Sequence, residues 1–144
     1  MTGKPMSAQK QNRQGIRDKF FCRTYLLDRD RADLYERINR RVDAMIAEGL
    51  LEEVKKLMKK KLSQTAEMAL GFREMRAHLE GKTTLPEAVE LLKKNTRHYA
   101  KRQLSWFRHE RDVHVISVAS NDTAKVISNK LLKHWNENIK SSEG

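Results

Sequence analysis

Apolar residues recur at intervals of three and four in the first half of the chain, and this spacing predicts two consecutive helices. Asp30 is suited to cap the first helix, which is expected to end before Gly49. Its apolar stripe consists of Leu34, Ile38, Val42, Met45 and Ile46. The same spacing then resumes in a second helix, whose apolar side carries Leu50, Val54, Leu57 and Met58. This half of the chain therefore has the pattern of packed helices.

A long helix is predicted in the second half of the chain. A shorter helix at 72–80, closed by Gly81, comes before it. Thr84 and Glu87 have the spacing of a capping box, which marks the start of the long helix. One inward stripe is expected to contain Leu85, Val89, Leu92, Thr96, Tyr99 and Gln103. The cations of the neighbouring face are Lys93, Arg97, Lys101 and Arg108, and they are therefore expected to be aligned.

Two short segments have the composition of strands, at 20–27 and at 113–118. Asn121 or Asp122 is expected to cap a last helix, and the residues expected to face inward on it are Ala124, Ile127, Leu131, Trp135 and Ile139. A sheet of two strands is not stable alone, so the strands must be covered, paired together, or paired with something outside the chain. The predicted fold class is mainly α with two short β-strands.

Composition separates a leader from a body and indicates the kind of partner. Residues 1–19 are polar and basic and show no period, so they are predicted to be a flexible leader, with the folded body at 20–144. The chain has 30 Lys and Arg against 19 Asp and Glu, a net charge of +11, which favours an anionic polymer as partner. No apolar run approaches the roughly 18 residues of a membrane span. With no signal-peptide pattern, the cytoplasm is the expected location.

Cations and aromatic rings occur together at 95–108. Phosphate attraction combined with ring stacking is how proteins hold single-stranded or looped RNA. Tyr99 and Trp106 are either stacking rings or core residues, and both interpretations stay open. A lysine run forms either a phosphate contact or an ordinary solvated face, and it consists of Lys55, Lys56, Lys59, Lys60 and Lys61. By its residues alone, the chain is a basic helical nucleic-acid-binding segment.

The residues of a catalytic centre are not recognisable in this sequence. Gly3 and Lys4 lack both the upstream glycine and the following Ser or Thr of a phosphate loop. Cys22 is the single cysteine, and the histidines are scattered without metal-ligand spacing. We therefore expect no catalytic and no metal-binding residue in this chain.

Four segments, in the same order, resemble the tRNA dimethylallyltransferase family. They are 2–7 (TGKPMS), 34–45 (LYERINRRVDAM) continued by 49–54 (GLLEEV), 70–75 (LGFREM) and 96–108 (TRHYAKRQLSWFR). The resemblance implies transfer of a dimethylallyl group from its diphosphate to the exocyclic N6 of the adenosine 3′ of the anticodon. It covers the C-terminal half only, the part of a P-loop-type α/β fold that follows the phosphate loop and the catalytic Asp.

The resemblance also implies the partners of the chain. They are a tRNA anticodon stem-loop, dimethylallyl diphosphate, and the missing N-terminal half, with Mg²⁺ expected for the full-length enzyme through ligands outside this chain. The chain alone is predicted to be inactive. The alternative is a stand-alone basic helical RNA-binding module without catalytic activity.

Site residues follow from the matched motifs. Arg37 and Arg41 match arginines that face the diphosphate, although ion pairing with Glu36 or Asp33 is the alternative for each. The residues expected to contact tRNA are Gly71, Phe72, Arg73, Glu74, Arg97, Lys101, Arg102, Gln103, Trp106 and Arg108. Of these, Arg97, Arg102 and Trp106 are expected to share one concave surface.

Overall fold

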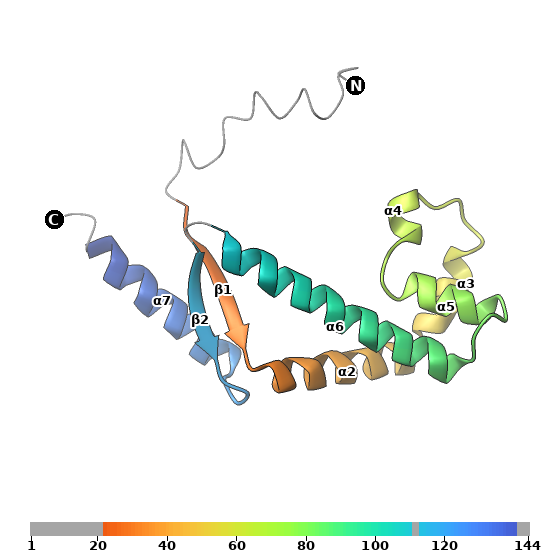
Figure 1. Ribbon diagram of the computed structural model, residues 1–144, viewed down its shortest axis with the longest axis horizontal. Helices are drawn as coiled ribbons and strands as arrows, with labels where there is room; N and C mark the ends of the chain where they lie inside the picture. Colours follow the sequence, from red (N-terminus) through yellow and green to blue (C-terminus); the bar gives the residue numbers. More distant parts are fainter. Residues whose placement is uncertain (1–21, 111–112, 141–144) are drawn as a thin grey trace, which may run out of the picture.

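The computed structural model describes residues 22–110 and 113–140 of the chain (Figure 1). The elements in chain order are β1 (Thr24–Arg29), α2 (Arg31–Ala47), α3 (Leu50–Leu57), α4 (Gln64–Glu67), α5 (Phe72–Leu79), α6 (Leu85–His109), β2 (Val113–Val118) and α7 (Ala124–Lys140). The fold class, mainly α with two short strands, is therefore confirmed. The predicted leader and the first two residues of the predicted first strand lie outside the described residues.

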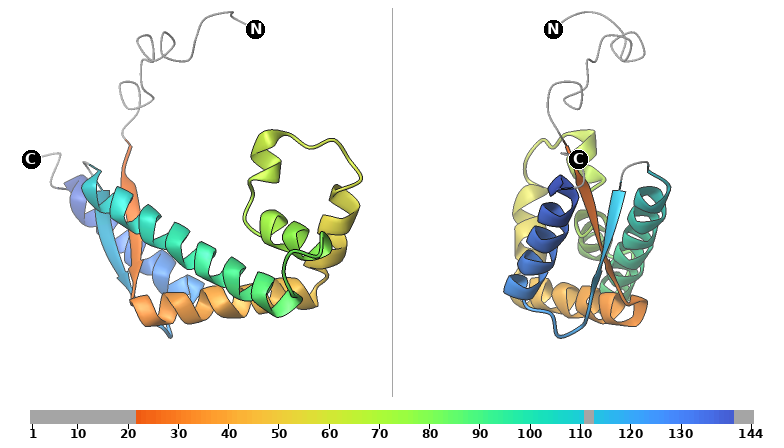
Figure 2. Two further views of the ribbon diagram at one scale, coloured as in Figure 1. Left: turned by 45° about the vertical axis from the view of Figure 1, so that its right-hand side comes forward. Right: turned by 90° about the vertical axis from the view of Figure 1, so that its left-hand side faces the viewer.

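The two strands pair with each other in parallel, with Thr24 opposite Val113 and Arg29 opposite Val118. Parallel neighbours need a crossover connection, and here it contains all the helices from α2 to α6. Figure 2 shows α6 on one side of the sheet and α7 on the other. Leu27 and Val115 are nevertheless 44% and 54% exposed, so the cover over this small sheet is incomplete.

The main hydrophobic core lies at the other end of the molecule, where α3 and α5 pack against α2 and α6 (Figure 1). Met75 of α5 is fully buried at its centre. The buried residues around Met75 are Val42, Val54, Phe72, Ala88 and Leu92. Helix α6 is therefore anchored by its first half, and its second half extends away from this core toward the sheet.

Local signals predicted the helix boundaries well. The Asp30 carboxylate accepts hydrogen bonds from the backbone N–H groups of Ala32 and Asp33, as expected for an N-cap. Gly49 separates α2 from α3 with a φ of 99°, a conformation that glycine adopts without a Cβ clash. At α6, the Glu87 carboxylate accepts from the backbone N–H of Thr84 at 2.7 Å, which completes the predicted capping box.

The predicted cap of the last helix is wrong. Thr123 caps α7, because its hydroxyl accepts from the N–H of Val126 and its carbonyl accepts from the N–H of Ile127. Asp122 instead accepts from the N–H of Ala119 and pairs with Lys130 of α7. The ammonium of Lys130 lowers the pKa of Asp122, and the Ala119 N–H adds to this effect. Asp122 therefore closes the loop between β2 and α7.

The predicted inward stripe of α6 is correct only in its first half. Leu92 is buried, whereas Tyr99 is 47% exposed and Gln103 is also exposed. The core formed with α3 and α5 reaches only the first half of α6, so none of the described residues covers the continuation of the stripe. The predicted row of aligned cations follows one side of α6, because Lys93 and Arg97 contact α2 and, further along, Lys101 and Arg108 line a cavity together with residues of α2.

Candidate RNA interface

The second half of α6 exposes aromatic rings next to a cation. Trp106 is 59% exposed, and Tyr99 lies on the same side of the helix. Between them, the guanidinium carbon of Arg102 lies 5.9 Å from the centre of the Tyr99 ring. We call these three residues the ring face. Tyr99 is 47% exposed and neither ring belongs to the hydrophobic core of the described residues, so both rings have surface available to stack on another flat group.

Arg97 does not belong to the ring face. Its Nη1 donates to Oδ1 of Asn39 in α2 at 2.6 Å, and the side chain is half-buried between the two helices. The expected shared surface therefore contains Arg102 and Trp106 but not Arg97. Lys93, one turn earlier, pairs with Asp43 of α2 at 2.8 Å, and that carboxylate raises the pKa of Lys93. These two cations hold α6 to α2.

Lys101 and Arg108 lie further along the side of α6 that faces α2, where they line a cavity of about 680 Å³ that we call the α2–α6 cavity. The Nη2 of Arg108 lies 2.9 Å from both carboxylate oxygens of Asp28, at the end of β1. Lys101 is exposed. Gln103 is exposed as well and lies beyond the lining of this cavity. The predicted tRNA-binding residues of α6 are thus distributed around the helix.

The turn before α5 is mostly part of the core. Gly71 is buried with a φ of 94°, Phe72 is 7% exposed and Glu74 is 3% exposed, whereas Arg73 faces solvent. The side chains of Phe72 and Glu74 therefore reach RNA only if this core opens. Of the four residues expected to contact tRNA here, Arg73 is the one with an exposed side chain.

Glu74 connects this turn to α6. Its Oε2 accepts from the backbone N–H of Gly71 at 2.9 Å, and its Oε1 accepts from the side-chain amide of Asn95 at 2.7 Å. Both carboxylate oxygens thus have donors, as a buried carboxylate requires. Asn95 was not predicted, because it meets Glu74 only through the packing of α5 on α6. The carboxylate fixes the turn next to the start of the basic and aromatic segment.

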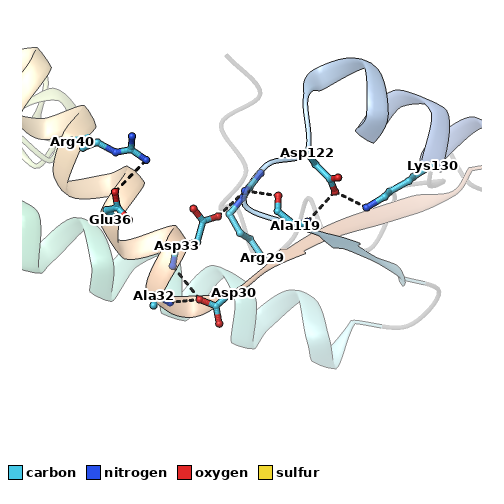
Figure 3. Close-up of polar contacts among 9 residues, drawn as sticks. All are labelled: Arg29, Asp30, Ala32, Asp33, Glu36, Arg40, Ala119, Asp122 and Lys130. Carbon is cyan, nitrogen blue, oxygen red and sulfur yellow. Dashed lines mark hydrogen bonds and ion pairs between the residues drawn. The ribbon is translucent and has the colours of Figure 1, made fainter.

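Arg37 and Arg41 lie one turn apart on α2 and line one hollow of about 560 Å³. The other lining residues of this hollow are Leu34, Ile38 and Arg40. The carboxylates that were the alternative partners are engaged elsewhere, since Glu36 pairs with Arg40 and Asp33 pairs with Arg29 (Figure 3). Within the described part of the chain, Arg37 and Arg41 are therefore exposed cations without an ion pair.

Arg29 was not predicted as an organising residue. Its Nη1 donates to the Asp33 carboxylate at 2.7 Å and to the carbonyl of Ala119 at 3.0 Å (Figure 3). It therefore joins β1, α2 and the loop that follows β2. No sequence signal singles out Arg29, because Ala119 is 90 residues away.

Two further findings concern the part of the chain that the structure describes. Within 22–110 and 113–140, no group of three or more His, Cys, Asp or Glu side chains is arranged to hold a metal ion. None of the helices there has both the length and the apolar character needed to cross a bilayer.

A model of the IPP transferase family matches residues 1–110. The chain belongs to this family. The tRNA dimethylallyltransferase of Halothermothrix orenii is 43% identical to it over 129 residues, which are 88% of this chain and 39% of the relative. The tRNA dimethylallyltransferase of Bacillus licheniformis is 49% identical over 115 residues, which are 78% of this chain and 36% of the relative.

Solved members of the IPP transferase family share the fold. The full-length tRNA isopentenylpyrophosphate transferase of Bacillus halodurans has a TM-score of 0.72 at 38% identity, covering 83% of this chain and 40% of that protein. The tRNA delta(2)-isopentenylpyrophosphate transferase of Staphylococcus epidermidis has a TM-score of 0.71 at 29% identity, covering 94% and 44%. The predicted family resemblance is confirmed, and the chain spans less than half the length of these relatives.

The link between Glu74 and Asn95 leads to a test of stability. Replacing Glu74 by Ala leaves the buried Gly71 N–H and the half-buried Asn95 amide without an acceptor, and an unsatisfied buried group costs about 1–3 kcal/mol. We expect Glu74→Ala to lower the free energy of unfolding in urea by at least about 2 kcal/mol. Glu74→Gln should lower the free energy of unfolding by less. The side-chain oxygen of the new glutamine still accepts from the N–H of Gly71, and the Asn95 amide can turn so that its oxygen accepts from the new NH₂ group.

The control for this test is Glu48→Ala, which removes an exposed carboxylate at the end of α2. A surface change of this kind is expected to alter stability by about 0.5 kcal/mol or less. If Glu74→Ala were as stable as the Glu48 variant, the coupling role of the buried carboxylate would be wrong.

Proposed function

We propose that this member of the IPP transferase family is the RNA-gripping part of a tRNA dimethylallyltransferase. The ring face carries the proposal, because two exposed rings with a cation between them suit unpaired bases joined by phosphates. The relatives are named as transferases that act on tRNA, which supports tRNA as the partner, and we propose the anticodon stem-loop as the part of it that binds. The second half of α6 is then the surface on which the loop rests.

In the reaction that we propose, the exocyclic N6 of the adenosine 3′ of the anticodon attacks C1 of dimethylallyl diphosphate. The new C–N bond forms as the C1–O bond breaks, pyrophosphate departs with the bonding electrons, and N6 loses a proton. The adenine must leave its stack to reach the donor. Gripping the loop next to the flipped base is the contribution that the ring face makes.

Arg37 and Arg41 are proposed to stabilise the negative charge that develops on the departing pyrophosphate. Their exposure, their shared hollow and the absence of carboxylate partners within the described residues support this role. Guanidinium groups suit it because they donate paired hydrogen bonds to phosphate oxygens. Neither residue takes the proton from N6, so the general base belongs to another part of the enzyme.

The remaining part of the enzyme is proposed to be the partner that completes the sheet and supplies the phosphate loop, the catalytic Asp and any Mg²⁺ ligands. The exposed apolar residues Leu27 and Val115 support a further layer over the strands. A cytoplasmic location is part of the same proposal, because the tRNA substrate is found there.

Complementation tests whether the chain is part of an enzyme. The purified chain alone is expected to transfer no dimethylallyl group to an anticodon stem-loop. Mixing it with the segment of the Bacillus halodurans relative that this chain does not cover should restore transfer, measured as radiolabelled prenyl-RNA. Arg41→Ala in the mixture should lower turnover more than RNA binding. Tight RNA binding with no transfer in any mixture would instead favour a stand-alone RNA-binding module.

The salt dependence of RNA binding tests the ring face. Arg102→Ala should weaken binding of an anticodon stem-loop and reduce the slope of log affinity against log salt by about one, because one phosphate contact is lost. The control is Lys133→Ala on α7, a cation that is 78% exposed on the opposite side of the sheet. Fluorescence anisotropy at several salt concentrations measures both quantities. An unchanged slope for Arg102→Ala would remove Arg102 from the RNA surface.

A further inference from the structure

The α2–α6 cavity lies where β1 ends and α2 begins, beneath the second half of α6. Its volume of about 680 Å³ is within the range of ligand sites. In α/β folds, ligands commonly bind outside the carboxyl ends of parallel strands, and this cavity has that position. Leu34 and Leu104 form apolar parts of its wall, and cations from both helices surround them.

The cations of this cavity differ in how far they are already neutralised. Arg108 is held by Asp28, and Arg29 is held by Asp33. Arg31 and Lys101 have no carboxylate partner within the described residues. Arg31 donates from Nε to the Tyr35 hydroxyl at 3.0 Å, with its guanidinium carbon 5.3 Å from the centre of the Tyr35 ring. The tyrosine therefore holds Arg31 in place while its two Nη groups stay available for an anion.

A second hollow connects the cavity to the ring face. It has a volume of about 360 Å³ and is lined by His98, Lys101, Arg102 and Ser105. Lys101 and Ser105 line both spaces, so the two hollows meet across α6. Arg102 belongs to the second hollow and also to the ring face. A band of cationic and polar side chains thus runs from Arg31, over α6, to the exposed rings.

The charge of the cavity suits a singly charged group. Four cationic side chains line it together with two carboxylates, Asp28 and Asp30. The hollow at Arg37 and Arg41 is lined by three arginines and no carboxylate, and of these arginines only Arg40 has an ion pair within the described residues. A diphosphate, with its higher negative charge, is favoured in the hollow at Arg37 and Arg41. A phosphodiester carries one negative charge and matches the α2–α6 cavity.

We propose that the α2–α6 cavity binds a backbone phosphate of the RNA strand whose bases stack on the ring face, with Arg31 and Lys101 as its ligands. The inference rests on the proposed function and extends it, because it adds residues of α2 to the RNA surface and sets the direction in which the strand crosses α6. Arg108 is a positioning residue in this arrangement, since Asp28 holds its guanidinium at the wall of the cavity.

The test compares Arg31→Gln, Lys101→Gln and the double variant in the full chain, using anisotropy with an anticodon stem-loop at several salt concentrations. Each single variant should weaken binding by roughly tenfold, the value of one charge-assisted hydrogen bond. Because both residues serve the same phosphate, the double variant should lower the salt slope by about one rather than two, and the two effects should not add. Arg31→Lys should retain most of the affinity, and Lys133→Gln is the matched control.

Two outcomes separate this inference from the proposed function. If Arg31→Gln binds RNA like the unmodified chain while Arg102→Ala binds weakly, the phosphate site is wrong and the RNA-binding role stands. If both variants bind like the unmodified chain, both proposals are wrong. Circular dichroism of each variant shows whether a loss of binding comes from unfolding. If Arg31→Gln is unfolded, the RNA affinity of Arg31→Lys decides whether the cavity binds a phosphate.

A calorimetric titration with pyrophosphate distinguishes the two sources of phosphate. Pyrophosphate binding is expected to depend on Arg37 and Arg41 and to be unchanged in Arg31→Gln. If Arg31→Gln abolished pyrophosphate binding, the cavity would be a diphosphate site and its assignment to RNA would be overturned.

Discussion

The packing of the first half of α6 against α5 and α2 determines where the other features of the molecule lie. This contact buries Ala88 and Leu92 of α6 around Met75, and Glu74 adds a buried polar link to Asn95 one turn further along. The helix is long enough to continue beyond this core to the sheet, where Arg108 meets Asp28. Between its fixed ends, the second half of α6 has one side that the described residues leave uncovered. The ring face occupies that uncovered part.

Whether a cation forms an internal contact depends on where it lies on α6 or α2. Lys93 and Arg97 face α2 and are used to hold the two helices together. Arg102, on the other side of α6, and Lys101, which lines the α2–α6 cavity, have no carboxylate partner within the described residues. The net charge of +11 therefore overstates the exposed positive charge, because some of the cations form contacts within the chain. Cations that remain exposed lie on α6, in the neighbouring hollows of α2, and in the lysine run at 55–61.

Sequence patterns predicted those features that depend on nearby residues. Asp30, Gly49 and the pair of Thr84 and Glu87 act within one turn of a helix, and their roles were predicted correctly. Features that depend on distant residues were missed. The exposure of Tyr99 follows from where α5 ends in space, and the contact of Arg97 with Asn39 joins residues 58 apart. The burial of Glu74 likewise needs Asn95, which local spacing does not indicate.

The central claim is that RNA lies across the second half of α6, and chemical-shift mapping tests it most directly. Isotope-labelled chain titrated with an anticodon stem-loop should show its largest shifts at the indole N–H of Trp106 and the backbone amides around Arg102. The indole of Trp135 on α7 is the internal comparison and should change little. Shifts concentrated on the lysines of α3 or on α7, with the Trp106 signal unmoved, would contradict the account.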